Sequence, residues 1–587
     1  MIGSRFISEN HRKNMLLIAF LALVVRLIIL PWSQTVHADA GSRILIALDW
    51  LSNPHYITDG YWGPLHHYLN AFFLWLFPGW VIGPKALNIT LATLTVFPLY
   101  GFTRNLFSNT KGAFFVALVY AFSPLVVRNS FQALAGVSYA FFVVFSMYFL
   151  SEGLKKGDLR HAAFAGLAIT LAAATRYEAW VIIAAFTLVG VLHKQFKFTA
   201  VFWLAAMLFP GTWMIGNQLE FGDFLYSVNQ NDVWNIQMEG INDKVDSIKL
   251  IERVVFFPMS FMLIVSPIAT ALLLFGLGWA ILKKKLSKQQ IIWLVPFLIM
   301  AAIFMQKAYV GTLMMQHRFT ITWMILLLPF LALVFIHPKW QKAKSILLTI
   351  SVVTAIPLSF TWVYWQHTKY LGQTNLAFAL DELTIGMSHE IEAIPLLRSK
   401  VTEQLIEEIK KNAVPNQGLI LDFMGWDKTT YTAIRAEINS YQTNGAKHGE
   451  TDFEYLNSYL DKHPKGQIVF HQLGKLNGKT VVRDSIFGWE ELNRWFVVDE
   501  VWTAPGLKLF NYREISLNEA ELVRTEEFDQ IGFFDMAHDA AFFEQKIRFD
   551  KSWFTKVRRR SFWDGETLET TMKKNTDYMI KEENQKK

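Results

Sequence analysis

Apolar segments separated by short polar loops fill the first 364 residues of the chain. A helix needs about 20 apolar residues to cross the hydrocarbon core of a bilayer, whereas a membrane strand needs only about ten. The segment lengths therefore predict a bundle of transmembrane helices and not a barrel. The predicted segments are 15–32, 64–82, 84–103, 112–128, 132–150, 161–176, 179–193, 198–216, 254–282, 291–306, 318–336 and 344–364.

Basic residues gather in the loops between these segments, around residues 155, 194, 284 and 340. Because cytoplasmic loops are enriched in Lys and Arg, these loops are predicted to lie inside. The loop 217–253, the turn 307–317 and the chain after Tyr364 then lie outside. The N-terminal Arg and Lys residues precede an apolar run that lacks a small-residue cleavage site, which predicts an uncleaved first span.

The first half of the bundle conflicts with this orientation. With both the N-terminus and the loop 151–160 inside, an even number of crossings must separate them, yet the pattern shows five segments. Either a segment between 64 and 150 is re-entrant, or one long segment consists of two short helices. The total is predicted to be odd, 11 or 13, with the C-terminal region outside.

The composition becomes charged and mixed after residue 364, which predicts a separate domain over 365–587. Apolar runs at 418–423 and 467–470 are typical of buried strands, and Pro505-Gly506 marks the turn of a hairpin over 495–512. Helices are predicted over 389–412, 428–437 and 452–461, and a solvated helix or disorder beyond 565. The fold class is thus mostly α: a polytopic transmembrane helical bundle, 1–364, followed by a C-terminal extramembrane α/β domain.

The composition is typical of a membrane protein and excludes several kinds of binding and catalytic site. Hydrophobic residues make up 52% of the chain, which exposes more apolar surface than a soluble domain tolerates. The net charge of +7 comes from the loop clusters, and no basic groove interleaved with aromatic residues indicates nucleic acid. The chain has no cysteine, which excludes disulfides, thiolate catalysis and cysteine-ligated metal.

The first outer loop, 33–63, carries the strongest candidate for chemistry. Asp39 follows the first span, where a carboxylate has lost part of its hydration and is costly without a cation, a metal or a substrate. There it is placed to act as a general base on a hydroxyl. Asp59 is a further acid in this loop. The alternative is a structural ion pair between Asp39 and Arg43, four residues later on a helix.

Cations at the outer ends of other spans are candidates for binding an anion. Arg176, in the break before Glu178, suits a phosphate oxygen, although pairing with Glu178 or Asp39 would equally hold the bundle together. His317 and Arg318 begin a later span, where the alternative is that Arg318 snorkels to the interface.

His66 and His67 open the second apolar segment, and one ring could hydrogen-bond a phosphate or bind a metal. Because adjacent residues face different sides of a helix, a chelate by the two rings is not indicated. No cofactor is predicted, and a divalent metal is possible but not indicated. P-loop, dinucleotide and Gly-x-Ser-x-Gly motifs are missing. An outward-facing transferase without nucleotide substrates must take its donor from a membrane lipid.

These features resemble the GT-C class of membrane glycosyltransferases, in particular bacterial relatives of the protein mannosyltransferases and the aminoarabinose transferase, often called family 39-like. The resemblance covers roughly the first 360 residues. Its matching elements are Asp39, the entry 64–69, the patterns 99–107 and 121–125, and the break 176–178.

The resemblance implies an inverting glycosyltransferase of the bacterial cytoplasmic (inner) membrane, with its C-terminal domain in the periplasm. It would move a sugar from a polyprenyl-phosphate-linked donor to a hydroxyl of a glycan, lipid or protein acceptor. Asp39 would take the proton of the acceptor, and Arg176 and Arg318 would stabilise the departing lipid phosphate. The further candidates for substrate binding are His66, His67, Asp59, Arg43, Glu178 and His317.

Two alternatives stay open. A metal-dependent oligosaccharyltransferase would share the fold but uses several acids around a divalent metal. A non-enzymatic transporter should show internal pseudo-symmetry and broken helices near the middle of the membrane, whereas the polar residues here gather at one face. In protein mannosyltransferases an acidic residue follows the first-loop aspartate directly, but here Ala40 does, which leaves the acceptor type open.

Overall fold

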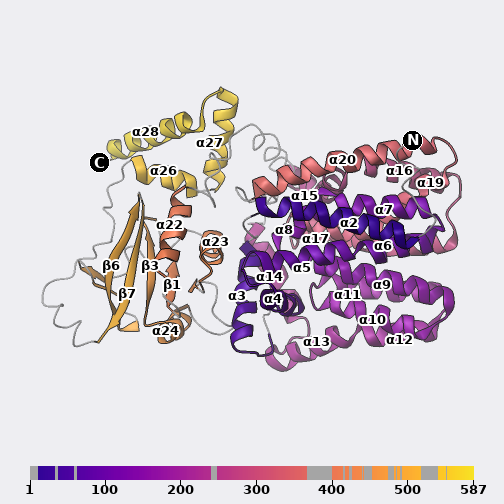
Figure 1. Cartoon of the computed structure of the whole chain (residues 1–587), viewed down its shortest axis with the longest axis horizontal. Coiled ribbons are helices and arrows are strands. Elements are labelled where there is room, and N and C mark those ends of the chain that lie inside the picture. Colours follow the sequence, from indigo (N-terminus) through magenta and orange to yellow (C-terminus); the bar gives the residue numbers. More distant parts are fainter. Residues whose placement is uncertain are drawn as a thin grey trace. The chain divides into compact units, whose positions relative to one another are not determined.

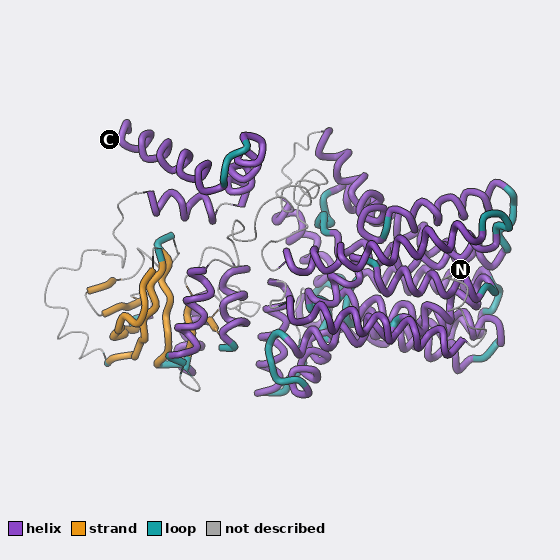
Figure 2. Tube along the Cα trace, turned by 45° about the horizontal axis from the view of Figure 1, so that its top comes forward, coloured by secondary structure: helices purple, strands orange, loops and turns teal. Residues whose placement is uncertain are grey.

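The chain is described by a computed structural model, and its described residues form two compact units (Figures 1 and 2). Unit 1 holds residues 11–33 and 46–366, and unit 2 holds 38–45 and 400–586. All described strands belong to unit 2. The described residues are 11–33, 38–57, 62–239, 247–366, 400–413, 417–421, 426–438, 440–441, 452–473, 481–483, 486–489, 492–504, 506–516, 540–549 and 551–586.

Unit 1 is built from helices and short helical turns. They are α2 (His11–Ile29), η1 (Leu30–Trp32), α3 (Ala38–Ser52, whose first turns belong to unit 2), α4 (Leu65–Leu76), α5 (Ile82–Leu94), α6 (Val96–Phe107), α7 (Thr110–Phe122), α8 (Pro124–Gln132), α9 (Gly136–Lys156), α10 (Leu159–Ala173), α11 (Glu178–Leu192), α12 (Phe196–Ala206), α13 (Leu208–Phe221), α14 (Tyr226–Glu239), α15 (Ser247–Ser260), η2 (Phe261–Val265), α16 (Pro267–Leu282), α17 (Lys288–Val310), η3 (His317–Thr320), α18 (Ile321–Leu327), η4 (Leu328–Ala332), α19 (Leu333–Ile336) and α20 (Gln341–Gln366).

The lengths of these helices confirm the predicted polytopic bundle. Among the described residues, six helical segments are long and apolar enough to cross a membrane. Two further pairs, α7 with α8 and α12 with α13, pass together but bend by 45° and 48°. Three further apolar helices, α10, α11 and α16, are shorter, with 15 or 16 residues each. The predicted total of 11 or 13 spans stays a prediction.

The predicted span 64–82 is wrong, and its correction changes the number of candidate crossings in the first half of the bundle. The segment 64–82 is not a single helix, because α4 ends at Leu76 and α5 begins only at Ile82. The 12 residues of α4 extend about 18 Å at 1.5 Å per residue, well short of a hydrocarbon core of about 30 Å. Without this segment, four candidate crossings remain between the N-terminus and residue 157, which is an even number.

The break between α8 and α9 is held by side chains from neighbouring helices. Ala133, at this break, adopts a left-handed conformation with φ of 58°, which costs a non-glycine residue about 1 kcal/mol or more. Asn88 of α5 donates to the carbonyl oxygens of Asn129 and Leu134 at 3.3 and 3.0 Å. Backbone groups inside a membrane protein must find protein partners, because lipid tails offer no hydrogen bonds. Asn88 therefore stabilises this helix end by donating to its free carbonyl groups.

Unit 2 contains a seven-stranded mixed sheet in the order β2-β1-β3-β7-β6-β5-β4. The strands β1, β2 and β3 pair in parallel, and the rest pair antiparallel. The elements are α22 (Lys400–Lys411), β1 (Gly418–Leu421), α23 (Trp426–Ala436), β2 (Ser440–Tyr441), α24 (Asp452–Lys462), β3 (Lys465–His471), β4 (Val481–Arg483), β5 (Ile486–Trp489), β6 (Arg494–Ala504), β7 (Leu507–Ile515), α26 (Ala540–Phe549), α27 (Lys551–Asp564) and α28 (Leu568–Lys586).

Alternate residues of the central strands pack into two separate hydrophobic cores. Ile420 and Ile468 pack with Leu460 of α24 on one face of the sheet. Leu419 and Val469 pack on the other face, in a cluster that includes Leu405 of α22 and Ala433 of α23. Because side chains alternate along a strand, one strand serves both faces, and the sheet is covered by helices on each side.

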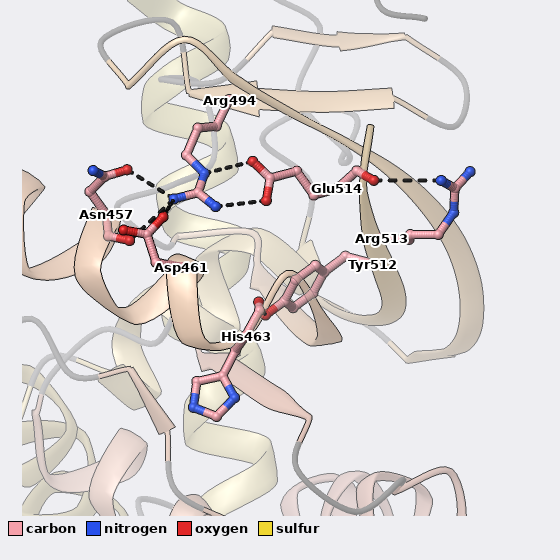
Figure 3. Close-up of polar contacts among 7 residues, drawn as sticks. All are labelled: Asn457, Asp461, His463, Arg494, Tyr512, Arg513 and Glu514. Atoms are coloured by element: carbon pink, nitrogen blue, oxygen red, sulfur yellow. Dashed lines mark hydrogen bonds and ion pairs between the residues drawn. The ribbon is translucent and has the colours of Figure 1, made fainter. Parts of the chain in front are cut away.

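One arginine ties α24 to the antiparallel half of the sheet (Figure 3). Arg494 of β6 forms a two-pronged pair with Glu514 of β7, with Nε–Oε1 at 2.7 Å and Nη2–Oε2 at 2.6 Å. Its Nη1 donates to Asp461 Oδ1 at 2.7 Å and to Asn457 Oδ1 at 2.9 Å. These hydrogen bonds, above all those to Glu514, raise the pKa of Arg494, so the pairing is charge-assisted.

The structure agrees with most of the elements predicted for this region. The strands at 418–423 and 467–470, the hairpin over 495–512 and the two helices between the strands are present as β1, β3, β6–β7, α23 and α24. Of the helix predicted over 389–412, the part before Lys400 lies outside the described residues. Beyond 565 the chain forms α28, which packs through Leu568 and Met572 with α26 and α27.

The chain has no cysteine, so single cysteine variants can test its orientation without background. We expect a membrane-impermeant maleimide added outside to label Pro78→Cys and Glu220→Cys but not Lys284→Cys, three positions exposed in the structure. Labelling is read by a mass shift on a gel, with detergent-permeabilised cells as the control for reactivity. If Pro78→Cys reacts only after permeabilisation, the segment around α4 crosses the membrane and the even count is lost.

Candidate functional site

Two of the predicted motifs lie against each other in unit 1. The backbone N–H of Leu65, at the start of α4, donates to the carbonyl oxygen of Ala174 at 3.0 Å. A Cβ added at Gly63 would overlap that carbonyl oxygen and lie 2.7 Å from the carbonyl carbon of Ala174. The entry to α4 therefore packs directly on the break between α10 and α11, and only glycine permits this approach.

Arg176 and Glu178, in this break, form an ion pair. Arg176 Nε donates to both carboxylate oxygens of Glu178 at 3.1 Å, and Nη2 also contacts Oε1. The side chains are 17% and 20% exposed, so the pair is only partly screened by water. The Arg176–Glu178 pairing left open by the sequence is thus present, and phosphate binding by Arg176 stays a prediction.

A single aromatic ring brings the two predicted arginines together. The guanidinium carbon of Arg176 lies 4.8 Å from the ring centre of Phe319, and that of Arg318 lies 5.3 Å from the same ring. Arg176 also lies 5.9 Å from the ring of Tyr139 on α9. Both guanidinium groups are within the range of cation–π attraction to this ring. One ring therefore contacts two arginines, of which Arg176 is already paired with Glu178.

His317, next to Arg318, is buried and held from two sides. Its ring stacks on Phe256 with centroids 4.8 Å apart, and its Nδ1 lies 3.0 Å from Ser260 Oγ. Ser260 Oγ is in turn 2.7 Å from Thr320 Oγ1. These contacts fix η3, the turn that carries Arg318.

The two histidines of α4 have different surroundings. His66 is buried, with Nδ1 at 3.2 Å from Ser138 Oγ and Nε2 at 3.3 Å from the carbonyl oxygen of Ala133. Both ring nitrogens of His66 thus contact the start of α9 and the break before it. The ring of His67 lies 6.2 Å from that of Trp62. Their roles in substrate binding stay predictions.

Asp39 and Arg43 belong to unit 2. Asp39 lies in the first turn of α3, where a carboxylate interacts favourably with the helix dipole, and it is 8% exposed. Arg43, one turn later, is 7% exposed. Asp59 lies outside the described residues.

The structure also shows buried cations that the sequence argument passed over. Arg26 of α2 is fully buried and donates to Ser130 Oγ of α8 at 3.1 Å and to the carbonyl oxygen of Ala22 at 3.0 Å. Lys85 of α5 is fully buried and donates to Ser33. Arg128 of α8 is 2% exposed. Each interrupts an apolar run, a signal that could have found them because charges inside membrane spans are rare.

Among the described residues, no group of three or more His, Asp or Glu side chains is close enough together to hold a metal ion. The candidate residues of unit 1 combine two arginines, aromatic rings and the carboxylate of Glu178. Arginine is suited to binding phosphate oxygens through charge and paired hydrogen bonds.

Comparison with known proteins agrees with the resemblance found in the sequence. Residues 62–214 match a family described as dolichyl-phosphate-mannose-protein mannosyltransferase. A search of curated proteins finds no match. The structure is similar to ArnT from Cupriavidus metallidurans bound to undecaprenyl phosphate, with a TM-score of 0.55 and 11% identity over 84% of this chain and 97% of that one. ArnT in the apo state gives a TM-score of 0.50 and 12% identity over the same shares.

These comparisons confirm the resemblance to GT-C glycosyltransferases of the mannosyltransferase and aminoarabinose transferase type, and a GT-C-like fold. The family match begins at Trp62 and includes α4, α8 and the Arg176 break. The buried cations Lys85 and Arg128 also lie within it.

The contact between Gly63 and Ala174 makes a prediction about stability. Gly63→Ala forces a methyl group into the backbone of the break and should lower the free energy of unfolding by about 1–3 kcal/mol. The matched control is Gly216→Ala on α13, where an added Cβ meets nothing within 4 Å. Thermal unfolding in detergent measures both. Equal melting temperatures for the two variants would show that the α4 entry does not pack on Ala174.

Proposed function

We propose that the protein is an inverting glycosyltransferase that moves a sugar from a polyprenyl-phosphate-linked donor to an acceptor hydroxyl, at the outer face of a bacterial cytoplasmic membrane. The observation that carries this proposal is the pair Arg176 and Arg318 beside one ring, Phe319. A lipid phosphate is an anion that can reach such a pair from the bilayer. The fold supports the proposal, because ArnT, which shares it, is bound to undecaprenyl phosphate in its structure.

The proposed chemistry needs one base and a stabilised leaving group. Asp39 accepts the proton of the acceptor hydroxyl while that oxygen attacks the anomeric carbon from the face opposite the phosphate. The bond between the anomeric carbon and the phosphate oxygen breaks, and the lipid phosphate leaves with both electrons. Its growing negative charge is stabilised by Arg176 and Arg318.

The roles of the other candidates follow from their places. Glu178 orients Arg176 through their two-pronged contact, and His317 fixes the turn before Arg318. His66, His67, Arg43 and Asp59 are proposed to contact substrate. The periplasmic domain, 365–587, is proposed to select the acceptor, which is a glycan, a lipid or a protein.

If the two arginines stabilise the departing phosphate, replacing either one should weaken stabilisation of the transition state. Arg176→Gln and Arg318→Gln should each lower kcat/KM for the lipid-linked donor by about 10²-fold, the usual effect of removing one donor to a developing anion. Arg160→Gln, an exposed position on α10, is the control and should leave kcat/KM unchanged. Release of undecaprenyl phosphate from a labelled donor measures turnover. Full activity in both site variants would remove the pair from the reaction.

If Asp39 is the catalytic base, replacing it should change the envelope glycans of living cells. Asp39→Asn should abolish transfer while the protein still inserts and binds undecaprenyl phosphate, since the amide keeps the shape but cannot act as a base. Mass spectrometry of envelope glycans should then show the same missing hexose or pentose in the Asn strain and in a deletion strain. Unchanged glycans in the Asn strain would exclude Asp39 as the base.

We further propose that the reaction needs no cofactor. Dialysis against EDTA should leave turnover unchanged if the arginines alone stabilise the phosphate. A loss of turnover that Mn²⁺ or Mg²⁺ restores would instead favour the metal-dependent oligosaccharyltransferase mechanism.

A further inference from the structure

The first turns of α3, which carry Asp39, pack within unit 2 and not within the membrane bundle. Residues 38–45 group with the C-terminal residues, whereas α3 from residue 46 onward groups with unit 1. Ala40, Gly41 and Ile44 form one buried stripe on these first turns, at the spacing that places them on a common face. A loop that follows the first span is therefore held by a helix almost 400 residues later in the chain.

The contact is made at Gly41, against α23. A Cβ added at Gly41 would overlap Cγ2 of Thr430 and lie 3.4 Å from Cγ1 of Ile434. The two helices thus approach each other at a distance that only glycine allows at this position. Close approach through small residues is a recurrent way to lock two helices in one register.

The other side of α23 is fixed to the sheet. Ala433 and Ala436 belong to the core that contains Leu419 of β1 and Leu405 of α22. Thr430 and Ile434 are each 1% exposed, so α23 is packed on the side that meets α3 as well. A helix held this way is a rigid support.

We propose that α23, through Thr430 and Ile434, is the positioning element that sets the location of the Asp39 carboxylate for proton transfer. This inference rests on the proposed function, in which Asp39 is the base. Asp39 lies two residues before Gly41 in the same helix, so a shift of the helix at Gly41 moves the carboxylate with it. A displacement of about 1 Å at a reacting group can cost about 10²-fold in rate.

Three variants test the contact. Gly41→Ala should lower kcat by about tenfold or more with KM for the donor changed less than twofold, because the acid moves and the donor site does not. Thr430→Ser removes the overlapping Cγ2 and supplies the reference kcat for the double variant. In the double variant Gly41→Ala/Thr430→Ser, the remaining contacts of the new methyl group are Cβ of residue 430 and Cγ1 of Ile434, both at 3.4 Å. These are ordinary distances, so kcat should return to within threefold of that of Thr430→Ser.

Helix propensity and fold loss are controlled separately. Alanine favours a helix over glycine by up to about 1 kcal/mol, so a lower kcat in Gly41→Ala would not come from fraying of α3. Gly278→Ala on α16, where an added Cβ meets nothing within 4 Å, reports the effect of the substitution alone. Melting temperatures of all variants are measured in the same detergent.

The outcomes separate this inference from the proposed function. If Asp39→Asn abolishes turnover but Gly41→Ala retains full kcat, α23 does not position the acid, and the inference fails while the function stands. If Gly41→Ala is inactive and Thr430→Ser does not rescue it, the overlap with Thr430 is not the cause and the inference also fails. If Asp39→Asn keeps full turnover, the proposed role of Asp39 fails first.

Discussion

A cation placed away from water needs hydrogen-bond acceptors from the protein for its N–H groups, and this need shapes unit 1. Arg26 uses a serine hydroxyl of α8 and a carbonyl of its own helix. Arg253 donates to the carbonyl oxygens of Ala308 and Leu313 at 2.8 and 3.1 Å. Both use hydroxyl or carbonyl oxygens of the protein as acceptors, as a buried cation must.

The broken helices also place polar side chains inside the protein. The 45° bend between α7 and α8 follows Ser123-Pro124, where proline cannot continue the hydrogen-bonding of the preceding turn. The bend leaves α8 wholly buried, with Arg128 and Ser130 in the interior of the protein. A continuous span would have exposed part of this polar helix to lipid. The same reasoning applies to the Arg176 break, where a short unwound segment both carries the cation and accepts a hydrogen bond from the entry to α4.

The sequence predicted the class of fold well, because length and hydropathy are strong signals for membrane helices. It failed at 64–82, since hydropathy averages over the break at Phe77–Val81 and cannot see where a helix ends. In unit 2 the buried strands β1 and β3 were predictable from continuous apolar runs. The short strands β2, β4 and β5 were not, because two to four residues carry no periodicity.

For the candidate site, single residues were predictable and their partners were not. Arg176 and Arg318 stood out as cations at span ends, but their shared ring, Phe319, is an ordinary aromatic residue in an apolar run. Only tertiary structure shows that one phenylalanine serves both. The grouping of α3's first turns with α23 was likewise hidden, since nothing local in residues 38–45 refers to a helix near residue 430.

Among the described residues, the sheet of unit 2 ends in very short strands on both sides, β2 with two residues and β4 with three. An open sheet edge is a template on which a second polypeptide can add a strand, and such pairing leads to aggregation. Edges this brief offer few backbone groups to a foreign strand. The described part of this sheet thus offers a second copy of the chain few backbone groups to pair with.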